Sequence, residues 1–288
     1  MLKKIILIIP LAILIFGCED PIPKDYEKIT IVEALLIIDE PIQNIRITKT
    51  MPLTELYNYD DAVIDDATVY IYEGEEEFEL VFRYSDAMGK SGYYFPDTTY
   101  LVKRNTTYNL KIILPDGTNV TGTTTTPDSI SWVKAFPKFV QYPLDSVNLP
   151  SDTSIYPEWT RSRSGNAFYF ANITCLDTLE YGKYLSPSTD ELNRRTYAPN
   201  RRERSYLELS VNAFVLSNRV PIPWRAFRWF GHHEIKIYVP DVNYEIWLMY
   251  VIMAGNLNEK AYTVKGCAGF FGSAFAIKDD FVLLKNQP

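Results

Sequence analysis

Few residues of the kinds that support enzyme catalysis occur in this sequence of 288 residues. The only histidines are His232 and His233, next to each other in a segment with a strand pattern. Because neighbouring residues of a strand point to opposite faces, the two imidazoles are badly placed to bind one metal ion together. Glu234 shares a face with His232, which leaves two ligands where catalytic zinc needs three from the protein. We therefore expect no metal centre here.

Pairs of adjacent acids are the other groups whose chemistry could matter. They are Asp60–Asp61, Asp65–Asp66 and Asp279–Asp280. Adjacent acids in loops are mostly solvated surface, and no ligands are spaced as in a calcium-binding loop, so calcium binding is the second choice. The sequence also contains no Gly-x-Ser-x-Gly nucleophile motif. We expect a protein that is not an enzyme and has no cofactor, with a hydrolase of unusual site as the enzymatic alternative.

Three glycines near the C-terminus, Gly266, Gly269 and Gly272, are spaced three residues apart. A phosphate-binding loop would need a lysine and a serine or threonine in register, followed by a helix, and the sequence provides neither. The glycines instead predict backbone with positive φ, or strands in close contact.

The segment of residues 219–233 concentrates aromatic and basic side chains. Arg219, Trp224, Arg225, Phe227, Arg228 and Trp229 are its candidates for a partner interface. Arginine and tryptophan are enriched in binding hot spots, and the nearby basic run of residues 193–204 contrasts with an acidic chain. The alternative is a loop whose aromatic side chains cover a core. We prefer the core interpretation because most aromatic side chains in a chain are core.

The formal net charge of −7 argues against nucleic acid as a partner. Besides Cys18, the chain contains only Cys175 and Cys267. Outside the cytoplasm these two could form a disulfide, and closing a loop of about 90 residues would stabilise the fold by about 4 kcal/mol. Two buried free thiols are the alternative, and spacing alone does not decide between them.

The pattern of the mature chain is mainly that of β-strands. Seven segments rich in β-branched and aromatic residues predict short strands at 29–39, 42–50, 67–74, 77–84, 92–96, 106–117 and 119–126. This spacing predicts an immunoglobulin-like β-sandwich over residues 26–126. Residues 127–288 predict a second, β-rich domain with one late helix, which Asp241 begins and Gly255 ends.

The first residues have the three parts of a secretory signal peptide. Two lysines come first, an apolar run covers residues 5–16, and Gly17 precedes Cys18. The run is shorter than the roughly 20 apolar residues of a membrane-spanning helix. Residues 15–18 resemble a bacterial lipobox, in which the cysteine is acylated and becomes the mature N-terminus. We therefore expect a signal peptide over residues 1–17 and a lipid anchor on Cys18.

Residues 18–25 form the expected tether, and the globular part begins near Tyr26. Two prolines stiffen the tether. The acids Glu19 and Asp20 directly after the cysteine resemble the signal that sends Bacteroidota lipoproteins to the outer face of the outer membrane. Acids that only solvate the tether are an equal alternative. We expect a protein anchored in the outer membrane and facing the cell exterior.

Several motifs together resemble a known family. They are the lipobox, the strand element that ends in Pro115-Asp116-Gly117, the threonine-rich segment after it, the late helix, and the terminal segment of residues 266–275. This combination is similar to the Bacteroidota lipoproteins of domain of unknown function 4249. The resemblance implies a non-enzymatic binding or gating accessory of a SusC-like TonB-dependent transporter, with that barrel as its partner. A structural subunit of an outer-membrane assembly or secretion complex is the alternative.

Overall fold

The computed structural model describes residues 26–52, 54–85, 91–143, 156–164, 168–176, 181–192, 196 and 210–285. The expected signal peptide, the tether and Cys18 lie outside the described residues, as does the basic run of residues 193–204 apart from Thr196.

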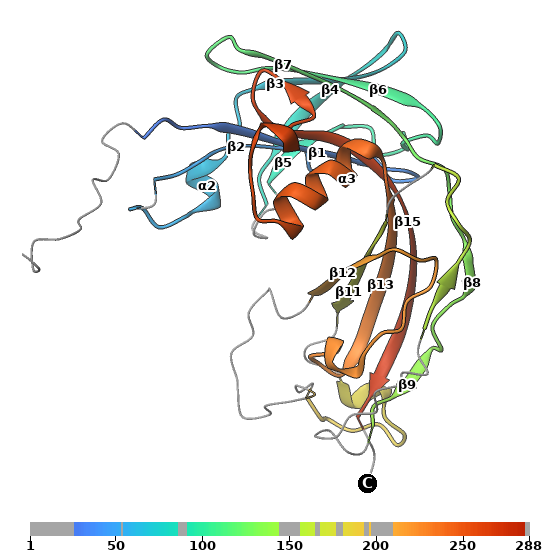
Figure 1. Cartoon of the computed structure of the whole chain (residues 1–288). Helices are drawn as coiled ribbons and strands as arrows, with labels where there is room; N and C mark the ends of the chain where they lie inside the picture. The colour runs from blue at the N-terminus through green and yellow to red at the C-terminus, as the bar shows by residue number, and fades with distance from the viewer. Residues whose placement is uncertain are drawn as a thin grey trace, which may run out of the picture.

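The described strands form two large sheets and one small one (Figure 1). The first sheet has the order β12 (Ser210–Val215), β11 (Tyr169–Cys175), β13 (Gly231–Pro240), β15 (Ala268–Leu284), β1 (Thr30–Ile37) and β2 (Arg46–Lys49), and β9 (Phe139–Gln141) also pairs with β15. The second has the order β14 (Val264–Lys265), β7 (Asn119–Thr125), β6 (Thr107–Ile113), β3 (Thr68–Glu73), β4 (Glu76–Arg83) and β5 (Gly92–Tyr94). The small sheet pairs β8 (Trp132–Lys134) with β10 (Glu158–Trp159).

Helices are few and short among the described residues. They are α2 (Tyr59–Ala62), α3 (Val242–Trp247), the π-helical turn η4 (Leu248–Met253), and the 3₁₀ turns η1 (Tyr181–Tyr184), η3 (Trp224–Ala226) and η5 (Glu259–Ala261). The structure confirms the fold class predicted from the sequence, which is a mainly β chain with an N-terminal immunoglobulin-like sandwich, a second β-rich part and one late helix.

One long strand, β15, joins the two halves of the chain. Its first part pairs in parallel with β1, from Ile31 opposite Ala268 to Ile37 opposite Ala274. Its second part pairs antiparallel with β13 as far as Leu283. In Figure 1, β15 starts beneath the second sheet, near β1, and curves down toward β9. The N-terminal sandwich therefore contains β14 and half of β15, so the expected division at residue 126 does not separate the two halves in space.

Alternation along the strands decides which side chains form the core. On β1, Val32, Ala34 and Leu36 are buried between the two sheets, while the residues between them face the other way. Along β6, Tyr108, Leu110 and Ile112 are buried on one face, as their period-two spacing predicts. Burial of this alternating set holds the two sheets together.

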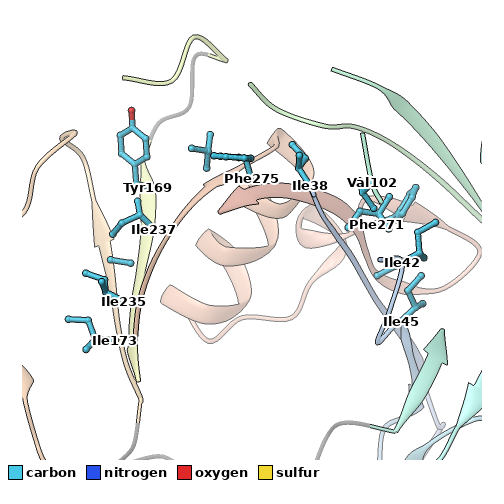
Figure 2. Packing of buried hydrophobic residues seen from close by; sticks show 14 of the residues in the cluster. Ile38, Ile42, Ile45, Val102, Tyr169, Ile173, Ile235, Ile237, Phe271 and Phe275 are labelled. Carbon is cyan, nitrogen blue, oxygen red and sulfur yellow. The ribbon is translucent and has the colours of Figure 1, made fainter. Parts of the chain in front are cut away.

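The first sheet is shared by both halves of the chain. The C-terminal half buries the same face of this sheet that carries Val32, Ala34 and Leu36 on β1. Figure 2 shows the sheet arching over α3, with Ile173, Ile235 and Ile237 on the outer side of the arch. The small sheet covers this side through Trp159, whose ring lies 5.2 Å from that of Tyr169. The opposite face of the sheet, on the inner side of the arch, contacts α3 and solvent.

The late helix begins and ends as its sequence predicts. The Asp241 side chain accepts a hydrogen bond from the Tyr244 backbone N–H and caps α3. After α3 the chain continues as the π-helical turn, and Gly255 follows with φ of 60°. Trp247 and Leu248 are buried, whereas Ile252 is 52% exposed, so only some of the large apolar side chains of this helical segment belong to the core.

All three spaced glycines are required by close contacts. Gly266 has φ of 99°, and a Cβ atom there would lie 2.3 Å from the Asn119 carbonyl oxygen. Gly269 has φ of 119°, and a Cβ atom there would lie 2.0 Å from the Val32 carbonyl oxygen. A Cβ atom on Gly272 would lie 2.8 Å from the Tyr244 backbone nitrogen, which lets α3 pack directly on β15. The prediction of positive φ or close contact is confirmed.

Candidate functional site

The aromatic side chains of the predicted partner interface belong to the core. Trp224, Phe227 and Trp229 are 7%, 1% and 3% exposed, and the Phe227 ring lies 5.8 Å from that of Phe281. The hypothesis of tryptophan anchors on the surface is therefore wrong, and the core interpretation is correct. The basic members of the set lie further out, since Arg219 and Arg225 are exposed and Arg228 is half-buried.

The two described cysteines do not form a disulfide. Both Cys175 and Cys267 are free thiols. Cys175 lies opposite His233, which pairs with Phe281 near the end of β15, whereas Cys267 directly precedes the start of that strand. Burial raises the pKa of the Cys267 thiol to about 11, so this thiol is a poor nucleophile at neutral pH.

The adjacent histidines do point to opposite faces. His233 is buried and its Nδ1 lies 2.9 Å from the Gly231 carbonyl oxygen, while the His232 Nε2 lies 3.6 Å from an Asp280 carboxylate oxygen. The ammonium group of Lys138 contacts Asp279 at 2.8 Å and Asp280 at 3.1 Å. Within the described ranges, no group of three histidine, cysteine or acidic side chains is placed to hold a metal ion.

The inner face of the arched sheet, together with α3, forms a groove with a volume of about 650 Å³. Its floor is made of the side chains of β1, β11 and β13 that alternate with the core residues. Glu33, Leu35 and Ile37 come from β1, Phe170, Asn172 and Thr174 from β11, and Lys236 and Tyr238 from β13. Since β1 and β13 are brought together only by β15, residues from both halves of the chain line one concave surface.

Helix α3 provides the wall of the groove. The rings of Tyr244 and Trp247 stack on Phe270 of β15, with centroid distances of 5.4 and 4.9 Å. On its other side, Leu248 packs against Phe168 and Phe170. These contacts fix the helix to the floor at both sides, so the groove is preformed.

Two ion pairs occupy the groove. Arg46 lies 3.0 Å from Glu33 across the β1–β2 pair, and Lys236 lies 2.8 Å from Glu234 on β13. Burial favours the neutral amine of Lys236, but the hydrogen bond to Glu234, together with the nearby charges of Glu234, Glu40 and the Tyr238 phenol, outweighs burial and raises the pKa of Lys236. Both basic side chains are therefore charged and already neutralised by neighbouring carboxylates.

Two tyrosine hydroxyl groups are also available in the groove. Tyr238 and Tyr244 line it, and their hydroxyl groups make no hydrogen bond to the part of the chain that the structure describes. Burial raises the pKa of both phenols, so they remain protonated at neutral pH. Each hydroxyl group can donate one hydrogen bond to a ligand and accept another.

A buried polar network attaches the wall of the groove to the sandwich. One carboxylate oxygen of Asp241 accepts from the backbone N–H groups of Tyr244 and Ser273, each at 2.9 Å. The other accepts from the Thr124 hydroxyl at 2.6 Å, and that hydroxyl also lies 2.9 Å from the Ser273 hydroxyl. Burial raises the pKa of Asp241 despite these hydrogen bonds. The network fixes the start of α3 relative to β7 and β15.

The groove contains the kinds of groups that line ligand-binding sites. It combines aromatic rings, paired charges and hydroxyl groups, but the described residues place no serine, cysteine or histidine nucleophile in its lining. Sequence reasoning missed this site because its polar residues look like the solvated face of ordinary strands. The available signal was the number of large side chains on that face, such as Leu35, Phe170 and Tyr238.

Comparisons with known proteins place the chain in a family without assigning an activity. No curated protein matches the sequence. Among solved structures, a three-domain immunoglobulin fragment of titin in a glutamate-to-alanine variant matches 91% of this chain at 8% identity with a TM-score of 0.19, and an I-band fragment of titin does so at 7% identity with a TM-score of 0.18. The chain spans 65% of the length of each, and such scores carry no argument.

Within the described residues, no helix has the length and apolar character needed to cross a membrane. The sequence matches a family of unknown function over residues 19–246, which is most of the chain. The chain therefore belongs to the family described as domain of unknown function DUF4249.

Proposed function

We propose that this protein is a lipid-anchored outer-membrane protein of the cell surface that acts as a non-enzymatic binding accessory of a TonB-dependent transporter. The groove between α3 and the shared sheet is the observation that carries the proposal. It is preformed, concave and lined by aromatic rings with a small number of polar groups, which is the usual character of a ligand site.

The location and the partner rest on the sequence. A lipobox that ends at Cys18 places an acyl anchor eight residues before the start of the described fold at Tyr26. A tether of that length keeps the globular part within about 30 Å of the membrane surface. The resemblance to Bacteroidota lipoproteins beside SusC-like transporters supplies the barrel as partner.

A structural subunit of an assembly or secretion complex has less support. Such a subunit needs partner surfaces, but it does not need a ligand groove, so the groove favours the binding accessory. A hydrolase has less still, because the described lining holds no serine, cysteine or histidine, and Glu33, one of its two carboxylates, is held by Arg46 at 3.0 Å.

Affinity purification from gently solubilised outer membranes tests this proposal. The bait is the full-length lipidated protein with a C-terminal tag, and its partners are identified by mass spectrometry. We expect a SusC-like barrel at near-equal amount. Recovery of the barrel and chaperones of an assembly complex instead, or of no barrel at all, would refute the transporter role.

A further inference from the structure

We infer that the groove binds an uncharged, hydroxyl-rich ligand, that is, a neutral saccharide, and that Tyr238 and Tyr244 are its principal hydrogen-bonding side chains. The inference rests on the proposed binding role and names the ligand class of that site. The inference follows from the charge balance of the groove, its hydrogen-bond donors and acceptors, its apolar surface, and the orientation of the sheet that forms its floor.

Charge balance argues against an anionic ligand. The two basic side chains of the groove, Arg46 and Lys236, are each held by a glutamate at 3.0 and 2.8 Å. The remaining lining acid, Glu40, has only the Gln43 amide as a side-chain partner among the described residues, at 3.4 Å. Among the described lining residues, a carboxylate or phosphate would therefore find no unpaired cation and would face an extra negative charge.

The polar groups of the groove match hydroxyl groups better than they match charges. Each phenol of Tyr238 and Tyr244 both donates and accepts. The outer atoms of the ion pairs and the amide of Gln43 add donors and acceptors side by side. A sugar hydroxyl also donates and accepts at once, so it can bridge the guanidinium and carboxylate groups of a pair such as Arg46–Glu33.

The apolar part of the groove suits the faces of sugar rings. Tyr94, Tyr238 and Tyr244 are half-buried, so part of each ring remains open to the groove, and Leu35 and Ile37 continue the apolar surface along β1. Saccharides alternate C–H faces with hydroxyl edges, and such a ligand covers rings and polar groups together.

The orientation of the floor argues against an extended peptide. The lining side chains stand on the face of the sheet, whose central strands β1, β15 and β13 are already paired on both sides. A peptide that adds as a strand needs an open sheet edge, and a helical peptide needs a groove that is apolar throughout. Neither condition is met by the floor of this groove.

The test uses the full-length lipidated protein in detergent. It is applied to an array of neutral, sialylated and sulfated oligosaccharides of plant, animal and microbial types, together with a set of extended peptides. We expect binding to neutral members, with affinity unchanged by added salt because no ligand charge is involved. Binding confined to anionic saccharides or to peptides, or no binding at all, would overturn the inference.

Three variants then locate the site by calorimetry with the best neutral saccharide. Tyr238→Phe keeps the ring and removes one hydroxyl group, so we expect the Kd to rise about three- to tenfold. Tyr238→Ala should raise it further. Tyr72→Ala is the matched control, because Tyr72 is a half-buried tyrosine on the other sheet, and its Kd should equal that of the wild type. If Tyr238→Phe binds the saccharide as tightly as the wild type and has an unchanged melting curve, Tyr238 is not a hydrogen-bonding residue of the site.

The two proposals fail in different ways. If the array shows no binding of neutral saccharides but the purification still recovers a transporter barrel, only the ligand class is refuted. Saccharide binding without a barrel refutes the transporter role alone.

Discussion

Trp229 shows how burial decides between two roles of one side chain. Its sequence context of arginines and aromatics is typical of a binding hot spot, but its side chain is only 3% exposed. We predict that Trp229→Ala lowers the free energy of unfolding by about 3 to 5 kcal/mol, because it leaves a large cavity. Thermal or urea unfolding measures this change. The exposed neighbour Arg225 is the control, and Arg225→Ala should shift stability by about 0.5 kcal/mol or less.

The buried carboxylate of Asp241 accepts the hydrogen bonds that hold the start of α3 in place. We predict that Asp241→Asn folds with near-normal stability, because the amide can still accept from two backbone N–H groups and can donate to Thr124. Asp241→Ala removes all these partners and should cost about 1 to 3 kcal/mol. Urea unfolding at pH 7 compares the two variants. Equal losses in both would show that the negative charge, and not the hydrogen bonding, is what holds the helix.

The raised pKa of Asp241 predicts how its contribution to folding stability changes with pH. Burial raises the pKa of Asp241 from its ordinary value of 3.8. A carboxyl group whose pKa is higher in the folded chain favours folding most at low pH, and this contribution is lost as the pH rises through the folded value. The unfolding free energy of the wild type, minus that of Asp241→Asn, should therefore fall between pH 3 and pH 7. A difference that rises over this range would contradict the burial of an ionisable Asp241.

At the scale of elements, β15 determines how the two halves fit together. Gly269 and Gly117 both have positive φ, but a Cβ atom would meet Val32 backbone at 2.0 Å only at Gly269, whereas nothing lies within 4 Å of Gly117. We predict that Gly269→Ala is much more destabilising than Gly117→Ala, because both pay backbone strain but only the first forces β1 away from β15. Chemical unfolding of both variants gives the comparison, and equal losses would mean that strain alone accounts for the effect.

The elements could be predicted where the pattern is local. Alternation of Tyr108, Leu110 and Ile112 fixed the face of β6, and Asp241 marked the start of the late helix. The groove could not be predicted, because its residues come from strands that are far apart in the sequence. Glu33 and Lys236 have the look of solvated side chains until β15 brings β1 and β13 into one sheet. Pairing over such a distance leaves no local signal.

Composition left two interpretations of the tryptophan-rich loop open for a related reason, although the preferred one, a core position, is correct. Residues 219–230 are rich in arginine as well as aromatics, so composition alone allows a surface or a core position. Burial against Phe281 of the last strand settled the matter for Phe227. The separation of the two cysteines likewise depends on the sheet. Cys175 on β11 is level with Phe281 near the end of β15, whereas Cys267 precedes the start of that strand.

At the scale of the whole molecule, the proposed lipid anchor on Cys18 would decide where the groove works. We predict that Cys18→Ala releases the protein from membranes or leaves the precursor uncut, because the acyl chains supply the anchor. Cell fractionation with a high-salt wash measures the bound fraction, and Cys267→Ala should stay bound as the wild type does. If the Cys18→Ala protein loses its signal peptide and still remains bound, lipidation is not the anchor.

The proposed orientation toward the cell exterior has its own test. Protease added to intact cells should degrade the wild-type protein, since the proposed role needs the groove outside the cell. Complete protection until lysis would place the protein on the periplasmic face and would remove the groove from contact with external ligands.

The central claim is that ligand bound in the groove is passed to a transporter, and uptake by intact cells tests it most directly. The ligand with the highest affinity on the array is labelled, and its energy-dependent uptake is compared in cells with the wild-type protein, Tyr238→Ala, Tyr72→Ala or no protein, at equal surface levels of the three proteins. We predict that uptake at low ligand concentration falls together in the Tyr238→Ala and deletion strains and stays normal with Tyr72→Ala. Uptake that is unchanged in the deletion strain would contradict the account.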